Sequence, residues 1–317
     1  MPFRFGSKEM KDLIITRSML YEVSRNIVER SVQTIPEDVK KEILDNADRE
    51  TGPLSKRSME SFVEKGEYAS KNRGLICSDT GWPLFYVRCG DNLKIERGFS
   101  LFKEVFQEVI RDETSKSHLR ATIVHPISRK NPGTNVGLFY PKVDITFDPK
   151  IDFLEILFVP KGGGSEIFGS YFKMLFAADG VEGVKQFVLE SYMASCYSGA
   201  TCPPNIIGVG VGGTGDECMK IAKEAAVLRP IGDRNPDPEI ASLEVELLEK
   251  IRGLGYGAMG FPGLTGALDL HMECALVHTG GLPVAFNAQC IIGRRNGVKI
   301  TPDGEIIYSN GGGWIYR

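Results

Sequence analysis

The chain has 317 residues, a formal net charge of −3, 42% hydrophobic residues and 25% charged residues, which is ordinary for a globular protein. This charge argues against nucleic-acid binding, which needs a strongly basic face. The N-terminus has no apolar secretory core, so we expect a cytoplasmic protein whose seven cysteines are reduced thiols or metal ligands. Only four histidines occur, which argues against a histidine-rich zinc site such as that of a zinc hydrolase.

The first part of the chain, residues 8–72, is predicted to be helical. Residues 13–28 place apolar side chains along one helical stripe. The pattern Thr34-Ile-Pro-Glu37 is typical of a capping box and predicts a second helix that ends near Arg49. A third amphipathic stretch covers residues 55–71. Because the outer faces of these stretches are mostly charged, we interpret them as scaffold.

The rest of the chain alternates strand and helix patterns. Alternating β-branched and aromatic residues predict strands at 84–88, 121–125, 143–147 and 153–159, with a helix at 101–116. Helices are predicted at 167–177, 181–193, 216–227, 238–253 and 265–277, followed by a hairpin at 298–308 that turns on residues 302–304. This order predicts an α+β fold, with an N-terminal helical region before a mixed sheet with packed helices. We expect one domain over 1–317, made of a helical subregion 1–72 and a site-bearing region 73–317.

Three long segments contain no formal charge, namely residues 191–215, 253–268 and 274–293. Glycines and prolines interrupt each of them, so none is expected to span a membrane. Loops this apolar and glycine-rich are typical of a buried site that backbone approaches closely. Tightly packed core turns are the alternative interpretation.

Three cysteines stand apart from the rest because each lies in a loop-like segment: Cys77, Cys202 and Cys290. We expect Pro203 to hold Cys202 in an extended conformation. The long spacings do not match the compact runs of ferredoxins or zinc ribbons, so spacing alone gives only weak support for a metal cluster.

The remaining cysteines have simpler interpretations. Cys218 and Cys274 fall in predicted helices and are expected to be buried and structural. Cys89 ends a predicted strand and is not expected to be functional, whereas Cys196 is ambiguous.

The run Gly208-Val-Gly-Val-Gly-Gly-Thr-Gly215 satisfies the dinucleotide-binding pattern before a predicted helix. No strand that ends in an acidic residue follows that helix, which argues against nicotinamide binding. The start of the helix could still attract an anion such as a substrate carboxylate.

Several rare strings, taken in order, resemble the class I, iron–sulfur type fumarate hydratases and the related L(+)-tartrate dehydratases, in their α subunit or N-terminal half. The resemblance covers residues 75–299. Its strings are Cys77-Ser-Asp-Thr-Gly, Leu119-Arg, Arg129-Lys-Asn-Pro-Gly-Thr-Asn135, Lys161-Gly-Gly-Gly-Ser-Glu166, Cys202-Pro-Pro, and His278 twelve residues before Cys290.

The resemblance implies a [4Fe–4S] cluster held by Cys77, Cys202 and Cys290, with a fourth iron open to the substrate as a Lewis acid. It implies that Asp79 assists the catalytic base and that His278 lies at the substrate pocket. It also implies substrate contacts from Ser78, from the guanidinium of Arg120, and from the backbone N–H groups of Gly163 and Gly164. Without the motifs, Arg120 would be interpreted as a surface ion-pair residue and His278 as a core histidine.

Two departures bear on the substrate. Ser78 stands where the family usually has a glutamine, and residues 131–135 differ from the usual Asn-Thr-Gly-Asp-Asn. The chain stops at Arg317 without the family's β half, which predicts a separate β subunit in an αβ heterodimer or heterotetramer.

The predicted function is reversible hydration of fumarate to malate. L(+)-tartrate dehydration to oxaloacetate is the alternative for a C4-dicarboxylate substrate. A non-catalytic iron–sulfur redox sensor is the alternative from another class. No membrane or nucleic-acid partner is expected.

Overall fold

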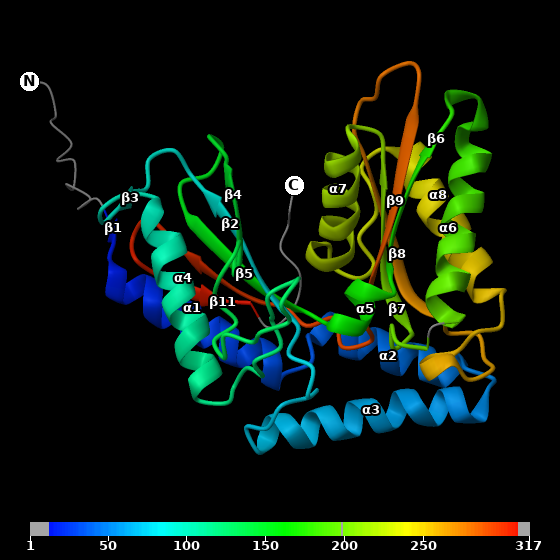
Figure 1. The fold of residues 1–317 in the computed structure, drawn as a ribbon. Helices are drawn as coiled ribbons and strands as arrows, with labels where there is room; N and C mark the ends of the chain where they lie inside the picture. The colour runs from blue at the N-terminus through cyan, green and yellow to red at the C-terminus, as the bar shows by residue number, and fades with distance from the viewer. Residues whose placement is uncertain (1–12, 198, 310–317) are drawn as a thin grey trace, which may run out of the picture.

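The computed structural model describes residues 13–197 and 199–309. Its helices are α1 (Arg17–Gln33), α2 (Glu37–Arg49), α3 (Pro53–Lys71), α4 (Ser100–Ser115), α5 (Gly163–Ile167), α6 (Gly180–Tyr197), α7 (Gly215–Leu228) and α8 (Pro238–Arg252), with 3₁₀ turns η1 (Ala177–Asp179) and η2 (Ala258–Gly260). Its strands are β1 (Ile14–Ile15), β2 (Trp82–Cys89), β3 (Lys94–Ile95), β4 (Lys142–Phe147), β5 (Leu154–Lys161), β6 (Ser170–Leu175), β7 (Asn205–Val211), β8 (Ala267–Cys274), β9 (Leu282–Gln289), β10 (Asn296–Ile300) and β11 (Ile306–Tyr308). The α+β fold class is confirmed (Figure 1).

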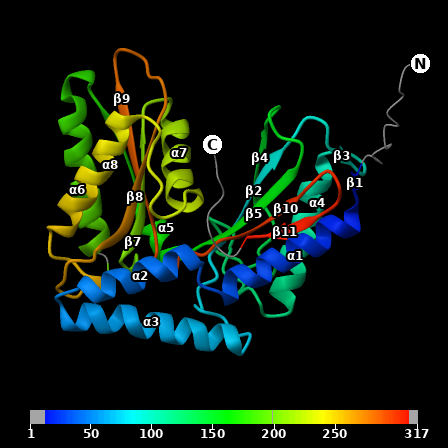
Figure 2. The same cartoon turned by 180° about the vertical axis from the view of Figure 1, so that it is seen from behind.

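Two sheets with helices between and outside them form the body of the protein. The five-stranded sheet has the order β11-β10-β5-β2-β4, and the four-stranded sheet has the order β6-β9-β7-β8. Only β2–β4 and β7–β8 are parallel pairs within these sheets. Helix α7 lies between the two sheets, with α1 and α4 outside one and α6 and α8 outside the other (Figures 1 and 2).

The five-stranded sheet is held mainly by one apolar core against α1 and α4. The Phe85 ring of β2 stacks on the Phe106 ring of α4 with centroids 4.0 Å apart. On the opposite face, Leu84 and Val159 pack against the C-terminal end of α7. With both faces covered, β5 is buried along its whole length, and it is apolar except for Glu155 and Lys161.

The four-stranded sheet accepts α7 closely because β7 carries glycines on that face. A Cβ placed on Gly208 would lie 2.0 Å from the Ala222 carbonyl oxygen, and one on Gly210 would lie 2.2 Å from that of Cys218. Any side chain there would push the helix away from the sheet. The glycine run that resembles a dinucleotide motif is therefore explained by packing between a strand and a helix.

Helices α2 and α3 lie across the lower end of the molecule in Figure 1 and form a third core with that end of the four-stranded sheet. Ile43 of α2 and Met59 of α3 are fully buried there with Ile206 and Leu268. No helix among residues 13–197 and 199–309 is long and apolar enough to cross a membrane.

Several predicted elements are confirmed and others are wrong. The three N-terminal helices, α4, α6, α7, α8 and the final hairpin are confirmed. The predicted capping box is wrong, because the Thr34 hydroxyl donates to the Arg30 carbonyl oxygen at the end of α1 and Pro36 precedes α2. Residues 13–16 also precede α1 rather than belonging to it, and predicted helical residues 8–12 lie outside the described residues.

Three secondary-structure predictions fail because tertiary contacts decide the outcome. Residues 167–177 and 265–277 are not helices but contain β6 and β8, which pair with β9 and β7. Residues 167–177 are mostly apolar, and a run of this length does not distinguish a buried helix from a buried strand. In β8, apolar residues alternate with Asp269, His271 and Glu273, which is the period of a strand. Residues 121–125 form no strand, since the N–H groups of Thr122 and Ile123 donate to the Asn135 side chain instead of a neighbouring strand.

Candidate functional site

Cys77, Cys202 and Cys290 come from three segments that meet where the two sheets are joined. Cys77 precedes β2, Cys202 precedes β7, and Cys290 follows β9 in the connection that crosses to β10. The other crossing, from β5 to β6, contains α5 and the glycine run 162–164. The chain therefore brings both of its sheet-to-sheet crossings and all three cysteines to one region, near α5 in Figure 1.

The three thiols are close enough to influence one another. Although part of the Cys202 side chain is exposed, desolvation by the surrounding protein raises its pKa to about 11, and the Cys290 thiol, the Cys77 thiol and the Asp79 carboxylate contribute in the same direction. Cys202 is exposed, Cys77 is half-buried and Cys290 is buried. A group of anions this dense needs positive charge nearby before all of its members can ionise.

The backbone at Cys202 differs from the predicted extended conformation. Its φ angle is +51°, in the left-handed region that non-glycine residues seldom adopt. Hydrogen bonds hold the loop from both sides, since Ile291 N–H donates to the Cys202 carbonyl at 3.0 Å and Met259 N–H donates to that of Pro203 at 2.8 Å. Such a conformation costs about 1–3 kcal/mol and is concentrated at functional sites in proteins.

Asp79 links the first cysteine segment to the glycine run. Its carboxylate accepts the N–H of Gly163 at 2.6 Å and the N–H of Gly81 at 3.0 Å. Gly81 has a φ angle of +71°, and a Cβ there would lie 2.0 Å from the Lys161 carbonyl oxygen, so only glycine fits. The Gly163 N–H is therefore occupied by Asp79, although the sequence predicted it to be a substrate donor.

Gly162 and Gly164 hold the remaining two cysteine segments close. A Cβ on Gly164 would lie 2.0 Å from the carbonyl oxygen of Ala200, two residues before Cys202. A Cβ on Gly162 would lie 3.7 Å from the Cys290 sulfur and 3.7 Å from Nη2 of Arg294. The absence of a side chain on Gly162 thus leaves space beside the Cys290 sulfur.

Two buried cations that the sequence reasoning assigned no role lie beside these thiols. Lys161 is fully buried, and its ammonium donates to the Ser165 hydroxyl at 3.0 Å and to the Ala288 carbonyl. Burial lowers the pKa of Lys161 to about 8, against the opposing effects of Glu166 and Cys290. Arg294 is also buried, and its Nη2 donates to the Asp79 carbonyl at 2.7 Å. Lys161 begins the string Lys161-Gly-Gly-Gly-Ser-Glu166, and Arg294 follows Cys290 by four residues. A positive charge next to glycine and apolar neighbours was the available signal.

The donor set suits an iron–sulfur cluster better than a single metal ion. Among residues 13–197 and 199–309, no three His, Cys, Asp or Glu side chains are grouped closely enough to hold one metal ion. Zinc would bond each of its cysteines at about 2.3 Å, whereas each cysteine of a [4Fe–4S] cluster binds a different iron. Three thiols on separate segments, space beside Gly162 and two buried cations fit such a cluster.

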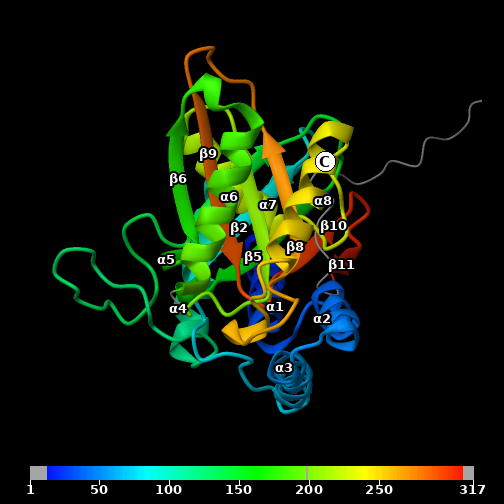
Figure 3. The same ribbon diagram turned by 90° about the vertical axis from the view of Figure 1, so that its right-hand side faces the viewer.

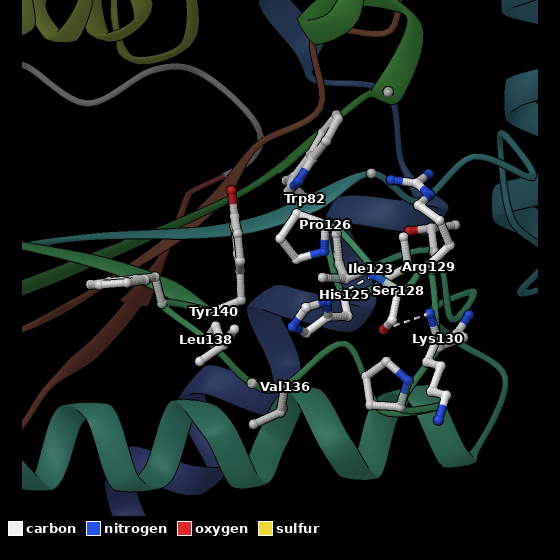
Figure 4. A pocket seen from close by; sticks show the side chains of 18 of the residues that line it. Trp82, Ile123, His125, Pro126, Ser128, Arg129, Lys130, Val136, Leu138 and Tyr140 are labelled. Atoms are coloured by element: carbon white, nitrogen blue, oxygen red, sulfur yellow. Dashed lines mark hydrogen bonds between the residues drawn. The ribbon is translucent and has the colours of Figure 1, made fainter.

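A cavity of about 1030 Å³ opens beside Asp79 and Gly163. Its remaining wall comes mostly from the loop 122–140, and Figure 4 shows the rings of Trp82, Pro126 and Tyr140 gathered on one side with Arg129 on the other. Arg129 was quoted as part of a motif but not predicted to bind substrate. The cavity shares Asp79 and Gly163 with the cysteine region, although none of the three cysteines lines it.

Asparagine side chains hold this loop in shape without a sheet. Asn135 is almost fully buried; its side-chain amide donates to the Arg120 carbonyl at 2.9 Å, while its Oδ1 accepts two backbone N–H groups. Asn131 donates to the Ala121 carbonyl at 2.9 Å. The motif 129–135 thus supplies the hydrogen bonds that fix the cavity wall.

Ser78 and Arg120 lie near the cysteine region, with exposed side chains. The backbone N–H of Arg120 donates to the Thr80 hydroxyl at 2.9 Å. Because Thr80 directly follows Asp79, this bond holds the Arg120 backbone near Asp79. Its guanidinium makes no hydrogen bond or ion pair with the part of the chain that the structure describes, and it does not line the cavity. Arg120 is therefore available at the surface beside the site.

His278 is the one predicted site residue that the structure does not bring to the cysteines. It lies in the exposed turn between β8 and β9, whereas Cys290 follows the opposite end of β9. The strand spans Leu282–Gln289, so the two residues are roughly 25 Å apart at about 3.3 Å per residue. The start of α7 lies at this same distant end, so the predicted anion site there is not next to the cysteines either.

The other cysteines lie outside the site. Cys218 is buried in α7 and its thiol bonds to the Gly210 carbonyl, as expected for a structural residue. Cys89 is buried at the end of β2, and Cys196 is buried in α6. The prediction for Cys274 is wrong, because this residue is exposed and lies at the end of strand β8, next to the turn between β8 and β9.

Comparisons with known proteins agree with the motifs. The model of the fumarate hydratase (fumerase) family matches residues 21–299. A protein of Methanocaldococcus jannaschii named "Putative L(+)-tartrate dehydratase subunit alpha" is 41% identical over 273 residues, 86% of this chain and 94% of that protein. The L(+)-tartrate dehydratase subunit alpha of Escherichia coli strain K12 is 30% identical over 284 residues, 90% of this chain and 91% of its own length. The family match covers all three cysteine segments and the whole four-stranded sheet.

Proposed function

This chain belongs to the fumarate hydratase (fumerase) family, and on that premise we propose that it is the α subunit of an iron–sulfur hydro-lyase. The reaction is the reversible hydration of fumarate to malate. The observation that carries the proposal is the convergence of three thiols from separate segments near Asp79, which also lines a cavity large enough for a dicarboxylate.

Cys77, Cys202 and Cys290 would hold the [4Fe–4S] cluster. When bound, the cluster supplies a Lewis-acidic iron that eases departure of hydroxide from malate and its addition to fumarate. The left-handed loop at Cys202 and the space beside Gly162 support this ligand set.

The chain's own side chains would orient the substrate and manage its proton. Asp79, fixed by two backbone N–H groups, assists the base that takes the proton from the carbon next to the hydroxyl-bearing carbon. Arg120 at the surface and Arg129 in the cavity wall are free to bind the two carboxylates as guanidinium forks. Ser78, exposed beside Cys77, would contact substrate, and Gly164 would help to shape the site.

His278 can act on substrate only in the site of another chain, because β9 separates it from the cysteines of its own chain. Its turn is exposed and ends in a loop that a second subunit could receive. We therefore assign His278 to a site completed by a neighbouring copy in the assembled enzyme.

A β subunit would complete the site by covering the cavity. Both relatives described above are named as α subunits. Large apolar side chains rim the opening here, with Ile127 exposed by 86% and Phe139 by 93%. In Figure 3 their loop projects beyond the sheets on the side of α5 and β6, where a second subunit could rest.

L(+)-tartrate is the second candidate substrate, since the names of the relatives specify it. Malate and tartrate differ in one hydroxyl group, so a polar side chain at the site would discriminate between them. Ser78 is such a side chain. A non-catalytic redox sensor is less well supported, because a sensor needs no cavity beside its cluster.

The test is anaerobic reconstitution of the chain with its β subunit, followed by assays with malate, fumarate and L(+)-tartrate. Turnover of one diacid with four irons per chain would support the proposal. A reconstituted complex that binds the cluster but converts none of the diacids would contradict the hydro-lyase and leave the sensor. A complex that binds no iron and sulfide would contradict both.

A further inference from the structure

Two consecutive arginines follow Cys290 and have different surroundings. Arg294 and Arg295 are each only 1% exposed. Arg295 forms an ion pair with Asp38 of α2. Arg294 makes no ion pair with any carboxylate of the described residues, and its Nε and Nη1 have no hydrogen-bond partner there. Its one hydrogen bond goes to a neutral acceptor, the carbonyl oxygen of Asp79.

A buried cation without an anion is costly, so its presence needs an explanation. Transferring a charged group from water to a protein interior costs several kcal/mol unless a counter-charge and hydrogen-bond acceptors are supplied. Lys161, the other buried cation of this region, has Glu166 at 3.8 Å together with a hydroxyl and a carbonyl acceptor. For Arg294, the described residues supply no such anion, which points to an anion that is not part of the chain.

The position of Arg294 identifies the anion's location. Its Nη2 lies 3.7 Å from the place that a Cβ of Gly162 would occupy, and the sulfur of Cys290 lies 3.7 Å from the same place. The same Nη2 donates to residue 79, two residues after Cys77. Arg294 therefore lies between two of the three cysteine segments. Arg294 is buried and does not line the cavity, whereas Arg120 is exposed, so a substrate carboxylate is the weaker candidate for Arg294.

We propose that Arg294 is a positioning residue that balances the negative charge of the iron–sulfur cluster and donates hydrogen bonds to its sulfur atoms. The inference rests on the proposed function, because it requires a cluster at the three cysteines. A cluster with three thiolate ligands carries net negative charge and offers sulfur acceptors. Net charge and hydrogen bonds to sulfur set both the retention of such a cluster and its reduction potential.

The experiment compares Arg294→Met, Arg294→Lys and the matched control Arg295→Met in the full chain with its β subunit. Three quantities are measured anaerobically. They are the rate at which a chelator removes the cluster, followed by its visible absorbance, the cluster's reduction potential, and the thermal midpoint of the cluster-free protein. Arg295→Met removes an equally buried guanidinium from the neighbouring position, so it reports the structural cost alone.

Arg294→Met is expected to lose its cluster at least about tenfold faster, as removal of a charge-assisted hydrogen bond predicts. Its potential becomes more negative, because a positive charge near the cluster is gone. Cluster-free Arg294→Met keeps or raises the thermal midpoint. Arg295→Met lowers it, because Asp38 loses its ion pair with Arg295, and leaves the reduction potential unchanged. Arg294→Lys recovers part of the retention because it keeps the charge.

Three results would overturn the inference. One is a wild-type rate of cluster loss and potential in Arg294→Met. A second is an equal fall in thermal midpoint for both Met variants that accounts for the cluster loss, which would make Arg294 a structural residue. The third is unchanged cluster retention with a raised KM for the diacid, which would assign Arg294 to the substrate. Failure of the wild-type protein to take up iron and sulfide would instead remove the proposed function and the inference together.

Discussion

The two ends of the four-stranded sheet look alike in the sequence and differ in the structure. Both ends are made of glycine-rich segments without formal charge. At the upper end in Figure 1, the turn after β7 bonds to β9 and to the segment after β8, since Gly212 N–H donates to the Pro283 carbonyl and Gly213 N–H to that of Leu276. The lower end instead gathers thiols, a carboxylate and two buried cations from different segments.

The difference teaches that a glycine-rich, uncharged segment shows close backbone packing and does not by itself indicate chemistry. The upper end is an exposed turn where Leu276 is 100% exposed. The lower end is enclosed by α2, α3 and both crossings between the sheets, so its side chains are desolvated and act on one another. Chemistry requires this second condition, and it depends on which distant segments meet.

The strongest test of this contrast compares a cysteine from each end. Cys290→Ala is expected to lower cluster content to background and turnover by more than about 10³-fold, since it removes one of three proposed ligands. Cys274→Ala, at the upper end of β8, should leave both within about twofold of wild type. Iron and sulfide analysis with a malate assay measures each. Equal losses in the two variants would break the contrast between the ends.

Between its two ends, the four-stranded sheet packs closely against α7. Gly210→Ala is expected to lower the free energy of unfolding by about 3 kcal/mol, because the new Cβ would lie 2.2 Å from the Cys218 carbonyl oxygen. Urea unfolding of the cluster-free chain measures the change. Gly137→Ala is the control, since nothing lies within 4 Å of its Cβ position, and it should change stability by less than about 0.5 kcal/mol. Matching stabilities for the two variants would contradict the tight packing of α7.

In the proposed function, His278 is the residue of the upper end that acts on substrate. His278→Ala is expected to lower turnover by about 10²-fold without changing cluster content, as loss of a proton-handling or polar substrate contact would. Mixing this variant with Cys290→Ala should restore part of the activity, since some assembled sites would then combine an intact cysteine set with an intact His278. A turnover at the wild-type level in His278→Ala would remove the upper end from function altogether.

Local patterns in the sequence predict most of the helices. The stripe in residues 17–33 and the apolar face of α4 each pack against a single sheet, so periodicity alone suffices. The same method fails for β8, an edge strand in which apolar residues alternate with Asp269, His271 and Glu273. This period of two is typical of a strand, and the helix prediction for residues 265–277 overlooked it. It fails again at residues 121–125, where the Asn135 side chain fourteen residues away from Ala121 takes the place of a partner strand.

Rare strings around the cysteines indicate a site, but they do not indicate its geometry. The motifs named Cys77, Cys202, Cys290 and Asp79, which the fold brings together. They also named His278, which lies twelve residues before Cys290, but the whole of strand β9 falls between the two and keeps them apart. Arg294 was missed because its meaning depends on the absence of a carboxylate nearby in space, which no local pattern reveals.

The smallest expected effect comes from Glu50, which lies between α2 and α3 at the lower end, and this effect depends on pH. Burial by itself would raise the pKa of Glu50, but N–H groups of Gly52, Leu264 and Thr265 and the Ser55 hydroxyl outweigh it and lower the pKa to about 2. A lowered pKa contributes stability above the unfolded value of about 4.5 and loses it as the pH falls towards 2. Glu50→Gln should therefore lower the free energy of unfolding by about 2 kcal/mol at pH 7. This is below the roughly 3 kcal/mol that the whole pKa shift would give without screening by solvent. The loss should become smaller as the pH falls below 4.5. Glu67→Gln, on an exposed ion pair with Lys40, serves as the control with no measurable change. Urea midpoints of the cluster-free chain between pH 3 and 7 measure the difference, and a gap that stays constant across this range would show that the Glu50 charge does not brace the lower end.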